Sequence, residues 1–160
     1  MNLTNQTAEI FVPDGTPAEK ALARTTHMGI GAHPDDLEFM ALHGILECFQ
    51  RPDQWFAGVT VTDGRGSARA GDYARYTDAE MRLVRRGEQK KAALIGEYGA
   101  MICLDFPSAA LKKPGHHPSQ GDSTLNRNLI EDLKALISTA SPDIIYTHNP
   151  ADKHDTHLAV

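Results

Sequence analysis

The sequence is poor in cysteine, in long apolar runs and in positive charge. It has 160 residues and two cysteines, Cys48 and Cys103. Because these two lie far apart in apolar contexts, buried thiols in a reducing cytoplasm are expected instead of a disulfide framework. No stretch approaches the 18 consecutive apolar residues of a membrane span, and the N-terminus lacks the basic segment and apolar core of a secretory signal. The sequence therefore predicts a cytoplasmic protein without a membrane span.

The charge balance is acidic, with 16 Lys+Arg against 21 Asp+Glu and a formal net charge of −5. This balance argues against a surface that tracks nucleic-acid phosphates, so no nucleic-acid partner is expected. The length fits one domain with its own core. Histidine is the abundant chemical group: there are eight, and His148, His154 and His157 lie within ten residues of one another.

Short apolar runs alternate with segments of helical period along the chain. The runs predict strands at residues 27–32, 55–62, 101–106 and 143–147. The helical periods predict helices over residues 35–49, 78–96 and 125–140. Long irregular stretches are expected over residues 63–77 and 107–123. This alternation predicts an α/β fold, with a Rossmann-like doubly wound, mainly parallel sheet in three α/β/α layers.

The domain boundaries come from composition. Residues 1–24 form an N-terminal extension, in which Pro17 is expected to open a short helix. The domain itself occupies residues 25–160. Its last residues, Leu158 to Val160, fall inside an apolar helical turn, whereas a boundary is expected in an exposed polar linker. The sequence thus predicts a domain truncated at its C-terminus.

A first polar cluster, His33-Pro34-Asp35-Asp36, lies directly between the first predicted strand and its helix. His33 and Asp36 are three residues apart across this turn, so both side chains can point at one spot while Asp35 points elsewhere. A helix N-terminus favours ionised carboxylates. The alternative is that both aspartates are helix caps, which is a common use of Asp at this position.

A second polar cluster runs from His148 to His157 and follows the last predicted strand. His154 and His157 are three residues apart, so one helical turn presents both on the same side. The alternative is a solvated polar loop. Because both clusters follow strands of one parallel sheet, they are expected to converge at its carboxyl edge, where open α/β sheets bind ligands.

Together the clusters supply the groups that zinc hydrolysis needs. Two imidazoles and one carboxylate are typical of catalytic zinc, which keeps one position for water and lowers its pKa toward about 7. A carboxylate that is not a ligand must take the proton, and Asp35 is placed for this. A histidine that is not a ligand can stabilise the developing oxyanion.

The segment His33–Asp36, preceded by Ala32 and followed by Glu38, resembles the opening motif of the PIG-L/LmbE-like zinc de-N-acetylases. His154-x-x-His157 resembles their second motif. Two further stretches also look similar to the family: residues 62–67, and Arg85-x-x-Glu88-Gln89. The resemblance therefore covers about residues 25–157.

The resemblance implies that His33, Asp36 and His157 hold one Zn²⁺, that Asp35 is the general base and that His154 polarises the amide carbonyl. Another divalent metal could occupy a site of this kind, since geometry and availability decide as much as affinity. It implies a Rossmann-like hydrolase that removes the N-acetyl group from an N-acetylglucosamine-type sugar or conjugate. Family members are often multimeric, which makes a homo-oligomer a candidate, but the sequence leaves the oligomeric state open.

The second motif departs from the common His-Pro-Asp-His pattern, because Asp155 and Thr156 stand between its histidines. The family's aspartate orients the first of them, His154. Either Asp152 or Asp155 is a candidate to replace that aspartate, and the sequence leaves the choice open.

Three further residues are candidate substrate contacts. Arg65 and Arg69 follow the second strand and could hold sugar hydroxyls, a phosphate or a carboxylate, although a solvated loop explains them equally well. His148 ends the last strand and is expected in the pocket. Arg85 and Arg86, on the long helix, are expected to form surface ion pairs.

Two other functions compete with a zinc-dependent N-deacetylase. The altered second motif would suit a catalytically silent sugar-binding or structural module of the same fold. Clusters of His and Asp on an α/β sheet also serve metal-dependent phosphoesterases, but these prefer two metals and more carboxylates than the motifs supply.

Overall fold

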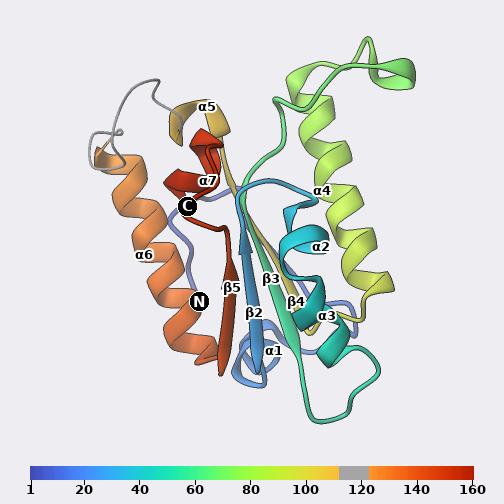
Figure 1. The fold of residues 1–160 in the computed structure, drawn as a ribbon, viewed down its shortest axis with the longest axis vertical. Coiled ribbons are helices and arrows are strands. Elements are labelled where there is room, and N and C mark those ends of the chain that lie inside the picture. Colours follow the sequence, from blue (N-terminus) through green and yellow to red (C-terminus); the bar gives the residue numbers. More distant parts are fainter. Residues whose placement is uncertain (112–122) are drawn as a thin grey trace.

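A five-stranded sheet forms the centre of the molecule, in a computed structural model that describes residues 1–111 and 123–160 (Figure 1). The strand order is β1 (Glu9–Phe11), β4 (Ala100–Phe106), β3 (Phe56–Thr62), β2 (His27–Gly31) and β5 (Ile144–Thr147). Neighbouring strands are parallel except for β1 and β4, which are antiparallel. The predicted mainly parallel sheet is confirmed, with one antiparallel strand at its edge.

Helices cover both faces of the sheet. One face carries α1 (Ala18–Ala23) and α6 (Ser123–Ala140), and the other carries α2 (Asp36–Met40), α3 (Leu42–Cys48) and α4 (Asp78–Ile95) (Figure 1). Three short helical segments complete the described structure: η1 (Gly71–Tyr73), α5 (Ser108–Leu111) and α7 (Asp155–Ala159). None of the described helices combines the length and hydropathy that a bilayer crossing requires. The three-layer α/β/α architecture expected from the sequence is confirmed.

Each face of the sheet has its own apolar core. On the α1/α6 face, Leu22 and Leu136 are fully buried against strand residues such as Val59. On the α2/α3/α4 face, Leu37 and Phe56 belong to a second buried cluster. The alternation of strand side chains between the faces explains why the central strands are continuous apolar runs in the sequence.

Most predicted elements lie within a residue or two of their observed positions. Helix α4 begins where the sequence suggested, with a capping box: the Thr77 hydroxyl accepts from the Glu80 backbone N–H, and the Glu80 carboxylate accepts from that of Thr77. The single helix expected over residues 35–49 is instead two, α2 and α3, which are interrupted at Ala41.

The N-terminal segment packs on the sheet. The short helix expected after Pro17 is α1, and residues 9–11 add the edge strand β1. A three-residue strand is too short to produce a periodic signal, so the sequence did not predict it. Of the irregular stretch expected over residues 107–123, the structure shows α5, and residues 112–122 lie outside the described residues.

The topology explains why distant motifs meet. From β2 the chain adds β3 and β4 in one direction, and it then returns to place β5 on the other side of β2. The sheet therefore changes winding direction between β2 and β5. In such folds, ligands bind in the crevice outside the carboxyl ends of the strands at this point. The loops after β2 and β5 both open there.

Candidate metal centre

The loop from β2 to α2 is a tight turn that presents His33 and Asp36 together. Asp36 Oδ2 accepts a hydrogen bond from the His33 backbone N–H at 2.6 Å, and the same oxygen lies 3.3 Å from His33 Nδ1. Asp35, between them, has a left-handed backbone with φ 88°. It occupies the N-cap position of α2 but makes no side-chain capping hydrogen bond. Its carboxylate is therefore not used as the helix cap that the sequence offered as an alternative.

The loop from β5 to α7 is organised by Asp152. Its Oδ1 accepts a hydrogen bond from the His154 backbone N–H at 3.0 Å, and its Oδ2 lies 2.7 Å from His157 Nδ1. The pKa of Asp152 is lowered, mainly by the hydrogen bond with His157. Asp152 thus orients the ring of His157, whereas Asp155 lies exposed in the first turn of α7.

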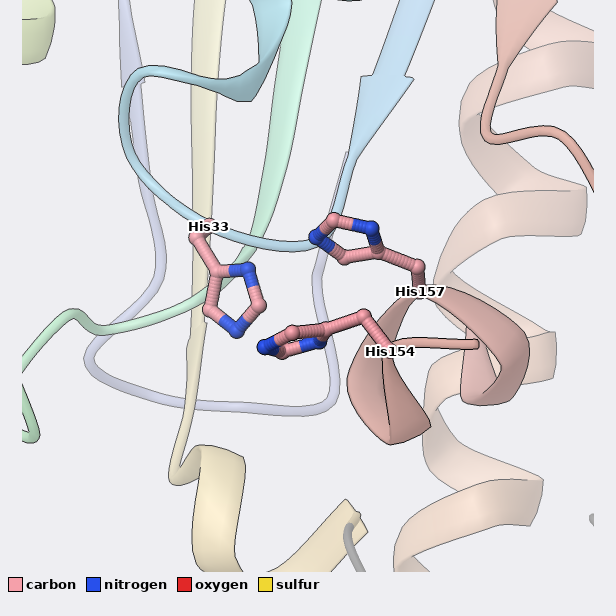
Figure 2. A group of neighbouring side chains, drawn as sticks. All are labelled: His33, His154 and His157. Carbon is pink, nitrogen blue, oxygen red and sulfur yellow. The ribbon is translucent and has the colours of Figure 1, made fainter. Parts of the chain in front are cut away.

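The two loops bring their imidazoles together, as predicted. Ring nitrogens of His33, His154 and His157 lie within 4.8 Å of one another, with His33 on the β2 loop and the other two on α7 or its N-cap (Figure 2). Asp36 Oδ2 lies 3.6 Å from His157 Nε2. Residues more than 100 positions apart in the chain therefore form one cluster.

Possible ligand atoms of a second group, Asp36, His148 and His157, also lie within 4.8 Å of one another. His148 Nε2, however, accepts a hydrogen bond from the Ala32 backbone N–H at 2.8 Å, so its lone pair is already used. This acceptor role requires a neutral ring with its proton on Nδ1. Burial lowers the pKa of His148 and outweighs the negative charge of Asp36, which acts to raise it. The lowered pKa favours the neutral ring. His148 is therefore a poor ligand in this arrangement.

His148 instead packs against His157. Its ring stacks on that of His157, with centroids 3.9 Å apart and planes 8° from parallel. Its side chain is 7% exposed and lies outside the wall of the neighbouring cavity. The structure thus places His148 behind His157, whereas the sequence suggested a substrate contact.

Asp36 lies from both His33 and His157 at the spacing of two ligands on a tetrahedral ion. Two ligands at 2.0–2.2 Å from such an ion lie about 3.3–3.6 Å apart. The carboxylate oxygen of Asp36 lies 3.3 Å and 3.6 Å from the ring nitrogens of His33 and His157. Burial raises the pKa of Asp36, but the hydrogen bonds from His33 outweigh it, so the pKa is lowered overall. An ionised carboxylate beside two imidazoles suits a divalent cation.

A cavity of about 410 Å³ opens beside this cluster. Its volume is in the range of small-molecule sites. The loops after β2 and β3, helix α4, the start of α5 and α7 contribute its wall, which comprises His33, Pro34, Asp35, Asp36, Gly64, Gly66, Ser67, Arg85, Ser108, His154 and His157. The predicted base and the predicted electrophile, Asp35 and His154, therefore face the same space as the ligand group.

The two arginines proposed as substrate contacts are not on this wall. Arg65 Nε donates to Asp63 Oδ2 at 2.5 Å. Arg69 donates to three backbone carbonyl oxygens of its own loop and pairs with Asp78 at 2.6 Å. Both side chains brace the loop after β3, and Arg69 thereby fixes the loop that carries Ser67 into the cavity.

Arg85 lies on the cavity wall, whereas the sequence predicted only a surface ion pair for it. Its Nη2 lies 2.6 Å from Asp35 Oδ2 and donates to the Pro34 carbonyl oxygen at 2.7 Å. It also makes the expected helical ion pair, with Glu88. A local pattern predicts that pair but not the approach of α4 to the β2 loop, which depends on tertiary packing.

Comparison with known families agrees with this geometry. A family model described as PIG-L, GlcNAc-PI de-N-acetylase, matches residues 28–160. Comparison with curated proteins finds no significant match. The matched range contains both histidine loops and every residue of the cavity wall. The chain therefore belongs to the PIG-L family of de-N-acetylases.

Proposed function

We propose that the protein hydrolyses the N-acetyl group of an N-acetylglucosamine-type sugar or conjugate, with one zinc ion held by His33, Asp36 and His157. The observation that carries the proposal is the position of the Asp36 carboxylate oxygen, 3.3 Å and 3.6 Å from the two ring nitrogens, at the wall of a small-molecule cavity. Membership of the PIG-L family supports the same reaction.

When bound, zinc would act as a Lewis acid and lower the pKa of a coordinated water toward about 7. The chain's own residues supply the rest. Asp35 would take the proton from the attacking water and pass it to the departing amine nitrogen, so that the C–N bond breaks and acetate and a free amine form. Arg85 holds one oxygen of this carboxylate in place.

His154 is proposed to stabilise the oxyanion by donating a ring N–H to the carbonyl oxygen of the amide. Its backbone is fixed by Asp152, and its ring lies at 5.0 Å and 4.3 Å from the ring centroids of His33 and His157. The ring is thus held next to the ligands, where charge on the carbonyl oxygen would develop.

An acetate-release assay tests the proposal directly. We expect the zinc-loaded chain to release acetate from GlcNAc-PI or a soluble N-acetylglucosamine glycoside, and metal analysis to find about one zinc per chain. Chelation should abolish turnover and added zinc should restore it. Zinc binding without turnover would favour the silent module, and release of phosphate from a phosphomonoester would favour the phosphoesterase.

Replacement of Asp152 by alanine is expected to weaken zinc binding about 10- to 100-fold, the usual effect of losing a carboxylate that orients a metal-bound histidine. The Oδ2–Nδ1 contact of 2.7 Å fixes the His157 ring and its tautomer. Competition with a chromogenic chelator measures the affinity. Asp155→Ala, three residues along the same segment, is the matched control and should change the affinity less than about twofold. Equal affinities of the two variants would contradict the role given to Asp152.

We also propose a cytoplasmic location. Cys48 and Cys103 are both free and buried. Burial raises the pKa of each thiol, which disfavours the reactive thiolate. Two unpaired thiols suit a reducing compartment.

A further inference from the structure

Asp35 has a backbone conformation that its own helix does not stabilise. Its φ of 88° and ψ of −21° lie in the left-handed region, which residues with a Cβ rarely adopt and which persists only when the surroundings enforce it. The N-cap position of α2 provides no side-chain hydrogen bond here. The backbone N–H of Asp35 donates instead to Gln89 Oε1 on α4, at 3.0 Å.

Gln89 is itself held rigidly. The residue is 2% exposed, and its Nε2 donates to Glu38 Oε1 at 2.8 Å. The same carboxylate oxygen accepts the hydroxyl of Tyr98 at 2.8 Å. Burial, reinforced by the negative charge of Glu38, raises the pKa of Tyr98, so the phenol stays a donor. Gln89 and Tyr98 therefore both donate to the Glu38 carboxylate. Gln89 must accept from the Asp35 backbone and donate to Glu38, which a side-chain amide does.

We propose that Gln89 is a positioning residue, which holds Asp35 in the left-handed conformation that directs its carboxylate into the cavity. The inference rests on the proposed role of Asp35 as the general base. Arg85, on the same helix, binds the carboxylate of Asp35 while Gln89 binds its backbone, so α4 fixes the base at two points. Gln89 lies outside the wall of the cavity at the metal centre, so it acts through Asp35 and not on the substrate.

The first test is Gln89→Met, which keeps the length of the side chain but removes both hydrogen bonds. We expect kcat for acetate release to fall about 10- to 100-fold, the effect of a misplaced catalytic group, with KM and zinc content within about twofold of the unmodified chain. In an Asp35→Asn background the same substitution should lower kcat no further, since there is no base left to misplace. An equal loss in both backgrounds would overturn the proposal and indicate a structural role.

The second test exchanges the amide and the carboxylate. Gln89→Glu alone sets two carboxylates at hydrogen-bonding distance and should lower kcat at least as much as Gln89→Met. Combining it with Glu38→Gln places an amide N–H group opposite the new carboxylate, and the Tyr98 hydroxyl can turn to accept from the same amide nitrogen. The hydrogen bond to the Asp35 backbone is then supported again, so kcat should recover most of the loss. Failure of the double variant to recover, while it folds as stably as the unmodified chain, would contradict the positioning role.

A third measurement does not depend on activity. Hydrogen exchange of the Asp35 backbone amide, measured by NMR on the metal-free chain, should be about tenfold faster in Gln89→Met than in the unmodified chain. In the double variant, Gln89→Glu with Glu38→Gln, it should be slow again. Unchanged exchange in Gln89→Met would overturn the proposal. If the unmodified chain released no acetate, the proposed function would fail, and the exchange rates would still decide whether Gln89 holds Asp35.

Discussion

Replacing Asp35 by asparagine is expected to lower kcat for acetate release by about 10²- to 10⁴-fold, the usual contribution of a general base. The substitution keeps the shape of the side chain but removes its ability to take a proton at neutral pH. The carboxylate is paired with Arg85 and its side chain is 58% exposed, so its loss leaves the apolar cores intact. Steady-state kinetics on the zinc-loaded protein measures the effect, and zinc content should stay at about one per chain.

Asp53→Asn provides the matched control. Asp53 also pairs with an arginine, Arg51, and its side chain is similarly exposed, but it lies at the opposite end of β3 from the cavity. Its variant should keep kcat within about twofold. If Asp35→Asn retained kcat within about threefold, Asp35 would not be the base, and another group on the cavity wall would have to accept the proton.

The parts of the site that the sequence predicted are those that follow strands directly. His33 and Asp36 come after β2, and His154 and His157 come after β5, so a parallel sheet alone places all four at one edge. The winding order then decides that β2 and β5 are neighbours. Local patterns of apolar and polar residues predict where each strand ends, and therefore which residues lie at the carboxyl edge of the sheet.

The parts that the sequence did not predict depend on packing between distant elements. Arg85 and Gln89 reach the β2 loop because α4 lies against it, and the helical period of α4 does not specify that approach. For Arg65 and Arg69, a loop without periodicity gave no indication of whether the guanidinium groups face the cavity or their own backbone. The structure shows the second arrangement.

A β-bulge creates a further feature that no sequence pattern indicated. Between β3 and β4 the register shifts, so that Thr60 faces Cys103 but Thr62 faces Phe106. Asp105, within the bulge, has a left-handed φ of 66° and a side chain that is 2% exposed. Its carboxylate pairs with Arg82 and Arg86 of α4. The bulge thus aims a buried carboxylate at two arginines.

Replacing Asp105 by alanine is expected to lower the free energy of unfolding by about 3–5 kcal/mol, because Arg82, with a side chain 26% exposed, loses its carboxylate partner. Arg86, with a side chain 19% exposed, is left with Glu9 as its carboxylate partner, at 3.6 Å. Urea unfolding at pH 7 measures the change. Asp53→Ala is the control, since Asp53 and Arg51 pair at the surface, with side chains 65% and 49% exposed, and such pairs contribute about 1 kcal/mol or less. A loss at Asp105 no larger than that at Asp53 would show that the buried pair contributes little net stability.

The effect of Asp105 should also depend on pH, with a defined sign. Burial raises the pKa of its carboxyl, but hydrogen bonds from Arg82, Thr7 and Arg86 outweigh burial, so the pKa in the folded state lies below the usual value. A carboxyl of this kind stabilises the fold fully above its unfolded-state pKa of about 4, and the contribution is lost as the pH falls through the folded-state pKa. The difference in unfolding free energy between the unmodified chain and Asp105→Ala should therefore be constant from about pH 6 to 8 and shrink below about pH 4. A difference that grew on acidification would mean that Asp105 is protonated in the folded state, and that the two arginines do not hold it as a carboxylate.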